Sequence, residues 1–199
     1  RNLEKHIENI KKFGVPVVVA INDYITDTEK EHAAIIDYCE NIGVLCKISS
    51  HWEKGGGGAK GLAEEVAKIA DSNSSEFKTL YDNKLSLWEK TKYIAQNIYG
   101  AADIIADLKV RNQFKKLEDD GFGEYPICMA KTQYSFSTDP LLMGAPSGHD
   151  VPIREVRLSA GAEFVVVVCG EIMTMPGLPK IPAAENINVD EKGLIQGLF

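Results

Sequence analysis

The sequence has little of what marks secreted, metal-binding or membrane proteins. Its four cysteines form no CxxC pair, and its four histidines occur in no HExxH pattern. No apolar run approaches the roughly 20 residues that cross a bilayer, and we recognise no secretory signal at the start. We therefore predict reduced core cysteines, no metal site, no membrane contact and a cytoplasmic location. The cysteines are Cys39, Cys46, Cys128 and Cys169.

Basic charge is also in short supply, with 22 Lys and Arg against 29 Asp and Glu and a formal net charge of -7. An acidic surface repels polyanions, which argues against general binding of nucleic acid or of an anionic membrane and leaves only local basic pockets open. The 44% hydrophobic and 26% charged content is that of a globular protein. Because the chain opens on Arg1, already within an amphipathic pattern, we expect it to be a piece of a longer protein.

Helical and strand patterns alternate through the first half of the chain. Apolar β-branched runs over 15–21 and 44–49 predict strands, and a Thr28-x-x-Glu31 capping box opens a helix between them. This order predicts an α/β fold, with part of an open, largely parallel sheet and flanking helices, followed by a smaller β-rich subdomain. Further helices are predicted over 77–99 and 103–118, and further strands over 125–132, 153–158 and 163–169.

The change from helices to strands predicts a boundary near Gly123, with one subdomain over 1–123 and another over 124–199. Ligands of open parallel sheets bind beyond the carboxyl ends of the strands. The loops over 22–27 and 50–60 are therefore the places to search for a site.

Two aromatic residues, Tyr24 and Trp52, follow the two predicted parallel strands. Their rings can border one crevice and stack on a flat heterocycle, or they can simply cover the core. Asp23, Asp27 and Glu53 also lie near this crevice, although solvation at the surface is the commoner fate of such carboxylates.

A glycine-rich stretch follows the second predicted strand. Gly56-x-Gly58-x-x-Gly61 matches the dinucleotide fingerprint, but no predicted strand ending in an acidic residue follows at the required distance. Gly56, Gly57 and Gly58 can instead form a loop that binds an anion at a helix N-terminus, or one that lets two chain segments approach closely.

Four strings, in the same order along the chain, resemble the C-terminal portion of formate–tetrahydrofolate ligase. They are VPVVVAIN followed by Thr26-Asp27-Thr28-Glu29, HWEKGGGGAKGLAEEV, YPICMAKTQYSFSTDP, and MTMPGLPKIPAA with a terminal GLIQGLF. The resemblance implies an ATP-dependent ligase that converts formate to formyl phosphate and passes the formyl group to N10 of tetrahydrofolate.

The resemblance also implies site residues and partners. Tyr24 and Trp52 fall where the family stacks two aromatic rings on the pterin, Ile48 falls on an apolar wall of that pocket, and the Ala145-Pro146-Ser147 stretch approaches the nucleotide. ATP with Mg²⁺ and tetrahydrofolate are then substrates of the parent enzyme. No catalytic residue and no tightly bound cofactor are expected in this chain. The resemblance further implies that a missing N-terminal nucleotide-binding domain carries the phosphate loop and that the full enzyme is a homo-oligomer.

Two other functions remain open. The chain can serve as an assembly module that walls the cavity of an oligomer without binding a ligand itself. It can also be a nicotinamide-binding oxidoreductase domain built on Gly56 to Gly61.

Overall fold

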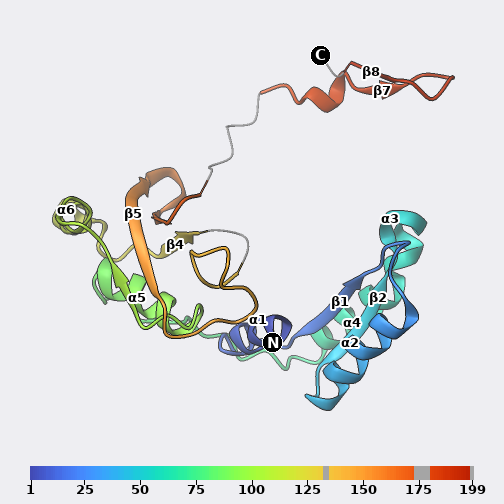
Figure 1. The fold of residues 1–199 in the computed structure, drawn as a ribbon, viewed down its shortest axis with the longest axis horizontal. Coiled ribbons are helices and arrows are strands. Elements are labelled where there is room, and N and C mark those ends of the chain that lie inside the picture. Colours follow the sequence, from blue (N-terminus) through green and yellow to red (C-terminus); the bar gives the residue numbers. More distant parts are fainter. Residues whose placement is uncertain (132–134, 173–179, 198–199) are drawn as a thin grey trace.

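The structure, a computed structural model, describes residues 1–131, 135–172 and 180–197 (Figure 1). Parts of the family-like strings, including Met175 to Pro179 of the string MTMPGLPKIPAA, lie outside the described residues. The described chain forms two units, each with its own sheet, and a separate terminal hairpin.

The first unit is a two-stranded parallel sheet with helices packed on it (Figure 1). Its elements are α1 (Asn2–Lys11), β1 (Val18–Asn22), α2 (Glu29–Asn41), β2 (Leu45–Ser49), α3 (His51–Lys54) and α4 (Gly56–Asp71). The register places Val18 opposite Leu45 and Asn22 opposite Ser49, so both strands end at the same edge. Helices α2 and α4 both contact β2. This β1-α2-β2 order is the crossover unit that parallel pairing requires.

The second unit is a four-stranded sheet in the order β3-β5-β6-β4. Its elements are α5 (Leu87–Asn97), β3 (Asp103–Ile105), α6 (Leu108–Leu117), the helical turn η1 (Glu118–Phe122), β4 (Ile127–Ala130), β5 (Asp150–Ser159), the turn η2 (Ala160–Ala162) and β6 (Phe164–Cys169). Strand β3 is parallel to β5 and β4 is parallel to β6, whereas β5 and β6 are antiparallel. The prediction of a mixed α/β fold with parallel strands and flanking helices is confirmed.

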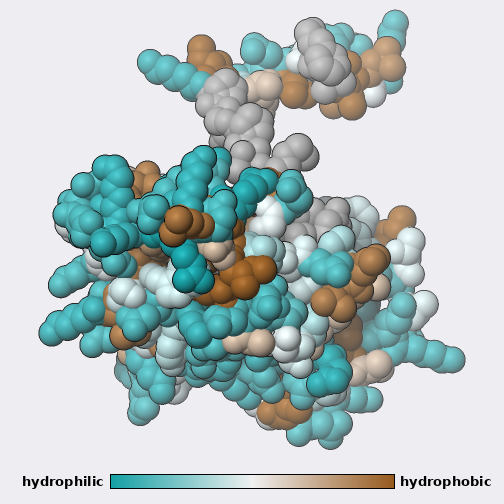
Figure 2. Space-filling model, turned by 60° about the vertical axis from the view of Figure 1, so that its left-hand side comes forward, coloured by the Kyte–Doolittle hydropathy of each residue, from teal (hydrophilic) through white to brown (hydrophobic). Residues whose placement is uncertain are grey.

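The terminal segment contains the turn η3 (Ala183–Glu185) and an antiparallel hairpin of β7 (Asn188–Val189) and β8 (Ile195–Gln196). Figure 1 shows this hairpin apart from the two units, and Figure 2 shows it as a separate body above a largely hydrophilic face. Within the described residues no helix combines the length and the apolar character needed to span a bilayer.

Two predicted helices begin later than their sequence patterns suggest. The helix predicted from residue 77 starts at Leu87, because the Glu76 and Lys78 amides donate to the Gly14 and Phe13 carbonyls at 2.8 and 3.0 Å instead of forming a helical turn. The helix predicted from residue 103 is preceded by strand β3, in which buried Ile104 pairs with Val151. In both cases contacts distant in the sequence outweigh local helical preference.

The hydrophobic side chains form two separate clusters. Ile7, Cys39 and Val44 form the first, which joins α1 to the first sheet. The second includes residues from Leu87 to Cys169 and draws on α5, β3 and α6 as well as on the later strands. The boundary near Gly123 stays a prediction, and these contacts favour an earlier division, before α5.

All four cysteines are free. Cys39 and Cys169 are buried as predicted, Cys46 is half-buried, and the core prediction is wrong for Cys128, which is exposed. Burial raises the pKa of Cys169 to about 12 and that of Cys46 to about 11, so both thiols are protonated at neutral pH.

Lys90 is a fully buried lysine that ties α5 to the segment before β4. Its Nζ atom donates to the Gly123 carbonyl at 2.7 Å and to the Tyr125 carbonyl at 3.1 Å. Burial lowers the pKa of Lys90, because removal from water disfavours the charged form. The two carbonyls offset part of that cost by accepting its hydrogen bonds.

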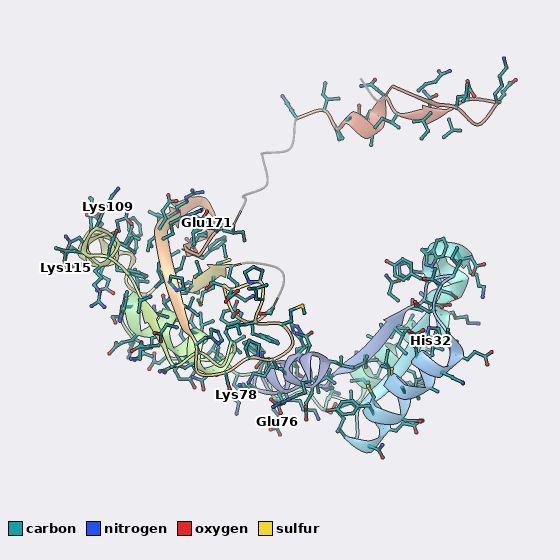
Figure 3. All side chains as sticks on the ribbon, in the orientation of Figure 1. His32, Glu76, Lys78, Lys109, Lys115 and Glu171 are labelled. Carbon is teal, nitrogen blue, oxygen red and sulfur yellow. The ribbon has the colours of Figure 1, made fainter. Side chains whose placement is uncertain are left out.

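Replacing Lys90 tests this arrangement. Lys90→Ala leaves a cavity and two carbonyls without their donor, so we expect the free energy of unfolding to fall by about 3 kcal/mol. Lys90→Met keeps most of the aliphatic stem, so its free energy of unfolding should fall by less. Lys115, exposed on α6 (Figure 3), provides the control, and Lys115→Ala should change stability by less than about 0.5 kcal/mol. Urea denaturation measures all three, and equal stability of Lys90→Ala and the unchanged chain would contradict the account.

Candidate functional site

The rings of Tyr24 and Trp52 lie together beyond the ends of β1 and β2. Their centroids are 6.2 Å apart and their planes differ by 27°. Tyr24 lies in the loop after β1, and Trp52 lies in α3, directly after β2. The parallel pairing that ends both strands at one edge therefore brings together two residues that are distant in the sequence.

Both rings keep much of their surface open to solvent, with 54% of Tyr24 and 50% of Trp52 exposed. Their polar atoms are engaged: the Trp52 Nε1–H donates to the Asp23 carbonyl, and the Asn22 Nδ2–H donates to the Tyr24 hydroxyl at 3.1 Å. This exposure disfavours the alternative that the rings only cover the core. Their apolar faces remain available for a ligand.

Ile48, the third residue of the expected ligand pocket, is the penultimate residue of β2 and pairs with Ile21 of β1. It is 42% exposed. An exposed apolar side chain at a strand end suits the wall of a pocket, and its contact with a ligand stays a prediction.

The loop between β1 and α2 is held by its own side chains. The Tyr24 amide donates to Asp27 Oδ2 at 3.0 Å, and the Asp27 amide donates to the Tyr24 carbonyl at 2.9 Å. The predicted capping box is confirmed, since Thr28 Oγ1 accepts from the Glu31 amide at 3.3 Å and Glu31 Oε2 accepts from the Thr28 amide at 2.8 Å. Hydrogen bonds from the Thr28 side chain and backbone lower the pKa of Glu31.

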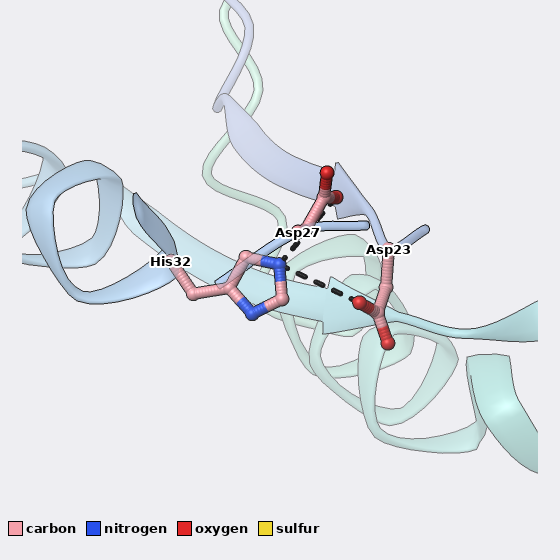
Figure 4. Close-up of side chains that lie close together, drawn as sticks. All are labelled: Asp23, Asp27 and His32. Atoms are coloured by element: carbon pink, nitrogen blue, oxygen red, sulfur yellow. Dashed lines mark ion pairs between the residues drawn. The ribbon is translucent and has the colours of Figure 1, made fainter. Parts of the chain in front are cut away.

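The sequence analysis predicted no metal site and missed one cluster of side chains, which come from this loop and from the first turn of α2. His32 Nε2 lies 3.5 Å from Asp23 Oδ1 and 3.7 Å from Asp27 Oδ2 (Figure 4). Neither carboxylate forms an ion pair with Lys or Arg within the described residues. Asp23, Asp27 and His32 follow the spacing i, i+4, i+9, which matches no familiar sequence motif. The three side chains come together only because the chain turns from β1 into α2 around Thr28.

The glycines at 56 to 58 form the first turn of α4, and the expectation that they lie in a loop is wrong. A Cβ atom at Gly58 would lie 2.5 Å from the Ser50 carbonyl oxygen, whereas Gly56 and Gly57 face open space. Gly58 is therefore required for the close approach of α4 to the end of β2, as one of the alternatives predicted. The anion site at this helix N-terminus stays a prediction.

The second predicted anion or nucleotide loop, Ala145-Pro146-Ser147, lies elsewhere. It lines a cavity of about 250 Å³ together with Gly100 and residues of α1, and the Gly148 amide donates to the Gly100 carbonyl at 2.9 Å. This cavity includes the cations Arg1 and Lys5 as well as two glutamates. The fold does not place this loop beside the first turn of α4 (Figure 1).

A larger cavity of about 720 Å³ lies between α1, the 77–83 segment, α5 and β4. Its lining is mostly apolar and includes Phe13, Phe77 and Phe136. Neither ring of the Tyr24–Trp52 pair lines it. The two features are separate places where this chain could contact another molecule.

Comparison with known proteins gives one consistent result. The whole chain, residues 1–199, matches the family model for formate–tetrahydrofolate ligase. It is similar to the formate–tetrahydrofolate ligase of Pelagibacter ubique, with 55% identity over 198 residues that cover 100% of this chain and 35% of the relative. The corresponding enzymes of Granulibacter bethesdensis and Ruegeria pomeroyi are each 57% identical over 198 residues that cover 100% of this chain and 35% and 36% of those relatives. The chain thus spans about a third of the length of these relatives.

A methyl group at position 58 should disturb the approach of α4 to the end of β2. We expect Gly58→Ala to lower the free energy of unfolding by about 1–3 kcal/mol, because the Ser50 carbonyl must move. Gly57→Ala is the matched control, with open space around the new methyl group and a gain of up to about 1 kcal/mol from higher helix propensity. Thermal unfolding measures both, and equal effects of the two substitutions would contradict the geometry.

The capping box of α2 should contribute a pH-dependent part of the stability. Because the folded-state pKa of Glu31 is lowered, this contribution is present above the usual glutamate pKa of about 4.3 and is lost as the pH falls through the lower folded value. Thr28→Ala should cost about 1 kcal/mol at pH 7 and less in acid. Unfolding curves of both proteins across this pH range measure the difference, and a pH-independent difference would count against the role of Glu31.

Proposed function

This chain belongs to the formate–tetrahydrofolate ligase family, and we propose that it forms the tetrahydrofolate-binding, C-terminal portion of such a ligase. The parent enzyme is cytoplasmic and uses ATP with Mg²⁺ to convert formate to formyl phosphate. The formyl group then passes to N10 of tetrahydrofolate. The observation that carries this proposal is the half-exposed pair of rings at the common edge of β1 and β2.

The geometry of the ring pair suits a pterin, which is a flat heterocycle. A flat ring held between two others needs a separation of about 7 Å, twice the usual contact distance between carbon atoms. The centroids of Tyr24 and Trp52 are 6.2 Å apart, less than this separation, so the two rings must move apart to admit the pterin between them. Each stacked ring contributes about 0.5–1.5 kcal/mol beyond burial. Ile48, exposed on the neighbouring strand, supplies an apolar wall.

We assign the binding of ATP and the phosphoryl transfer to formate to the rest of the parent enzyme. The dipeptide Gly-Lys does not occur in these 199 residues, so the phosphate-loop pattern GxxxxGK[ST] is absent from them. Phosphoryl transfer depends on positioning and on charge stabilisation by such a loop and Mg²⁺. We propose that this chain alone has no ligase activity and holds no catalytic residue. The Ala145-Pro146-Ser147 loop then approaches a nucleotide that is bound mainly by the missing domain.

The small size of the sheet in the first unit also indicates that another domain or subunit packs against it. Parallel sheets normally have more strands and are covered on both faces. The sheet of β1 and β2 has two strands, and among their residues only Ile21 and Ser49 are buried. We propose that the missing N-terminal domain, together with other subunits of a homo-oligomer, covers this unit.

Folate binding is tested by anaerobic titration calorimetry with tetrahydrofolate. Trp52→Ala removes one wall of the proposed clamp and should weaken binding about tenfold, which corresponds to about 1.4 kcal/mol. Tyr24→Phe keeps the ring and should bind within about twofold of the unchanged chain. Phe77→Ala, an exposed aromatic residue outside the ring pair, is the control. Unchanged affinity in Trp52→Ala would contradict the clamp.

A complementation experiment tests whether this chain is the C-terminal portion of the parent enzyme. The Pelagibacter ubique relative can be produced without its last third or without its first third, and this chain added to each. We expect 10-formyltetrahydrofolate to form from formate, ATP and tetrahydrofolate only with the version that lacks its last third. Restoration of the other version, or product formed by this chain alone, would overturn the proposal.

The two rival functions make different predictions. An assembly module without a ligand should sediment as a stable oligomer and show no folate affinity. The oxidoreductase alternative requires the glycine fingerprint in a loop between strand and helix, whereas Gly56 to Gly61 lie within α4. NAD(H) binding that Gly58→Val abolishes would nevertheless favour it.

A further inference from the structure

We propose that Asp23, Asp27 and His32 form a binding site for a divalent first-row transition metal ion, such as Mn²⁺ or Zn²⁺. The three side chains come from the loop between β1 and α2 and from the first turn of α2 (Figure 4). The proposed folate function gives none of them a role.

The spacing of the three ligand atoms suits a metal ion. Nitrogen and oxygen ligands lie about 2.0–2.2 Å from a tetrahedral zinc, which places pairs of ligand atoms about 3.3–3.6 Å apart. His32 Nε2 lies 3.5 Å from Asp23 Oδ1 and 3.7 Å from Asp27 Oδ2, and all three atoms lie within 4.8 Å of one another. Small side-chain rotations would therefore bring the three ligand atoms into three of the four coordination positions of a tetrahedral ion, and a water molecule can take the fourth.

A simple ion pair explains these distances less well. Charge-assisted hydrogen bonds between nitrogen and carboxylate oxygen are about 2.7–2.9 Å long. Both separations in the cluster exceed that length, and His32 Nε2 is buried without a hydrogen-bond partner in the described part of the chain. A buried polar atom without a partner is costly, and a metal ion would satisfy it by accepting its lone pair.

Charge and ligand type narrow the identity of the ion. Two carboxylates and one neutral imidazole give the site two negative charges, and none of the described lysines or arginines pairs with Asp23 or Asp27. A divalent cation balances that charge. Mg²⁺ prefers oxygen ligands alone, whereas a set of one imidazole and two carboxylates suits Mn²⁺, Zn²⁺ and related ions.

The site is pre-organised by the elements around it. The Tyr24 amide holds Asp27 Oδ2 at 3.0 Å, and the Thr28–Glu31 capping box fixes the start of α2. The His32 amide donates to the Thr28 carbonyl at 3.1 Å, so His32 lies on the first turn of that helix. Hydrogen bonds to the ligands from neighbouring groups orient them for metal binding.

The same hydrogen bonds connect the metal site to the aromatic pair. Trp52 Nε1–H donates to the carbonyl of Asp23, and Asp27 accepts from the amide of Tyr24. Drawing the two carboxylates toward an ion should therefore change the surroundings of Trp52. The expected signal is a metal-dependent change in Trp52 fluorescence that does not require ligase activity.

The test uses the 199-residue chain after treatment with a chelator. Titration with Mn²⁺, monitored by the loss of its aqueous electron paramagnetic resonance signal, should show one bound ion per chain. We choose Mn²⁺ because it prefers oxygen and nitrogen ligands over sulfur, so that exposed Cys128 does not compete with the site. His32→Gln and Asp23→Asn should each weaken binding at least about tenfold. Asp37→Asn, an exposed carboxylate on the same helix, is the matched control and should leave binding unchanged.

A second measurement separates loss of the site from loss of the fold. Circular dichroism should show that His32→Gln remains folded, and Zn²⁺ should change Trp52 fluorescence in the unchanged chain but not in this variant. Trp88→Phe in both proteins removes the other tryptophan from the signal. Wild-type affinity in His32→Gln, or no Mn²⁺ binding by the unchanged chain up to about 1 mM, would overturn the proposal.

Discussion

The parallel pairing of β1 with β2 is the interaction on which the candidate site depends. Because the two strands end at the same edge, the loop after β1 and the short helix after β2 meet there. The pairing brings together Tyr24 and Trp52, which are 28 positions apart in the chain, and it leaves their faces exposed. The proposed folate clamp depends on that edge, and the Asp23–Asp27–His32 cluster lies in the loop and helix that follow β1.

The sequence predicts the local elements of the first unit well because each has a strong local signal. The β-branched runs form β1 and β2, and Thr28 and Glu31 form the capping box at the start of α2. The position of the two aromatic residues follows from these elements and the rule that ligands bind beyond parallel strand ends. Their orientation does not follow from the sequence, because it depends on the hydrogen bond from Trp52 to Asp23.

Other features depend on contacts that a local pattern does not contain. Strand β3 forms because Ile104 pairs with Val151, and the 76–78 segment is drawn away from a helix by the backbone of Phe13 and Gly14. The glycines after α3 look like a loop but start a helix, since Gly58 must lie against Ser50. The cluster of Asp23, Asp27 and His32 has no recognisable spacing and emerges only from the folded turn. Long-range packing therefore determines what the sequence analysis missed.

The central claim is that the two rings hold the pterin of tetrahydrofolate. A crystal structure of the chain with tetrahydrofolate bound, either alone or joined to the missing portion of the enzyme, tests it most directly. The account predicts the pterin between Tyr24 and Trp52, within about 4 Å of both rings and beside Ile48. Tetrahydrofolate bound elsewhere, for example in the apolar cavity between α1 and α5, with the two rings free of contact, would contradict it.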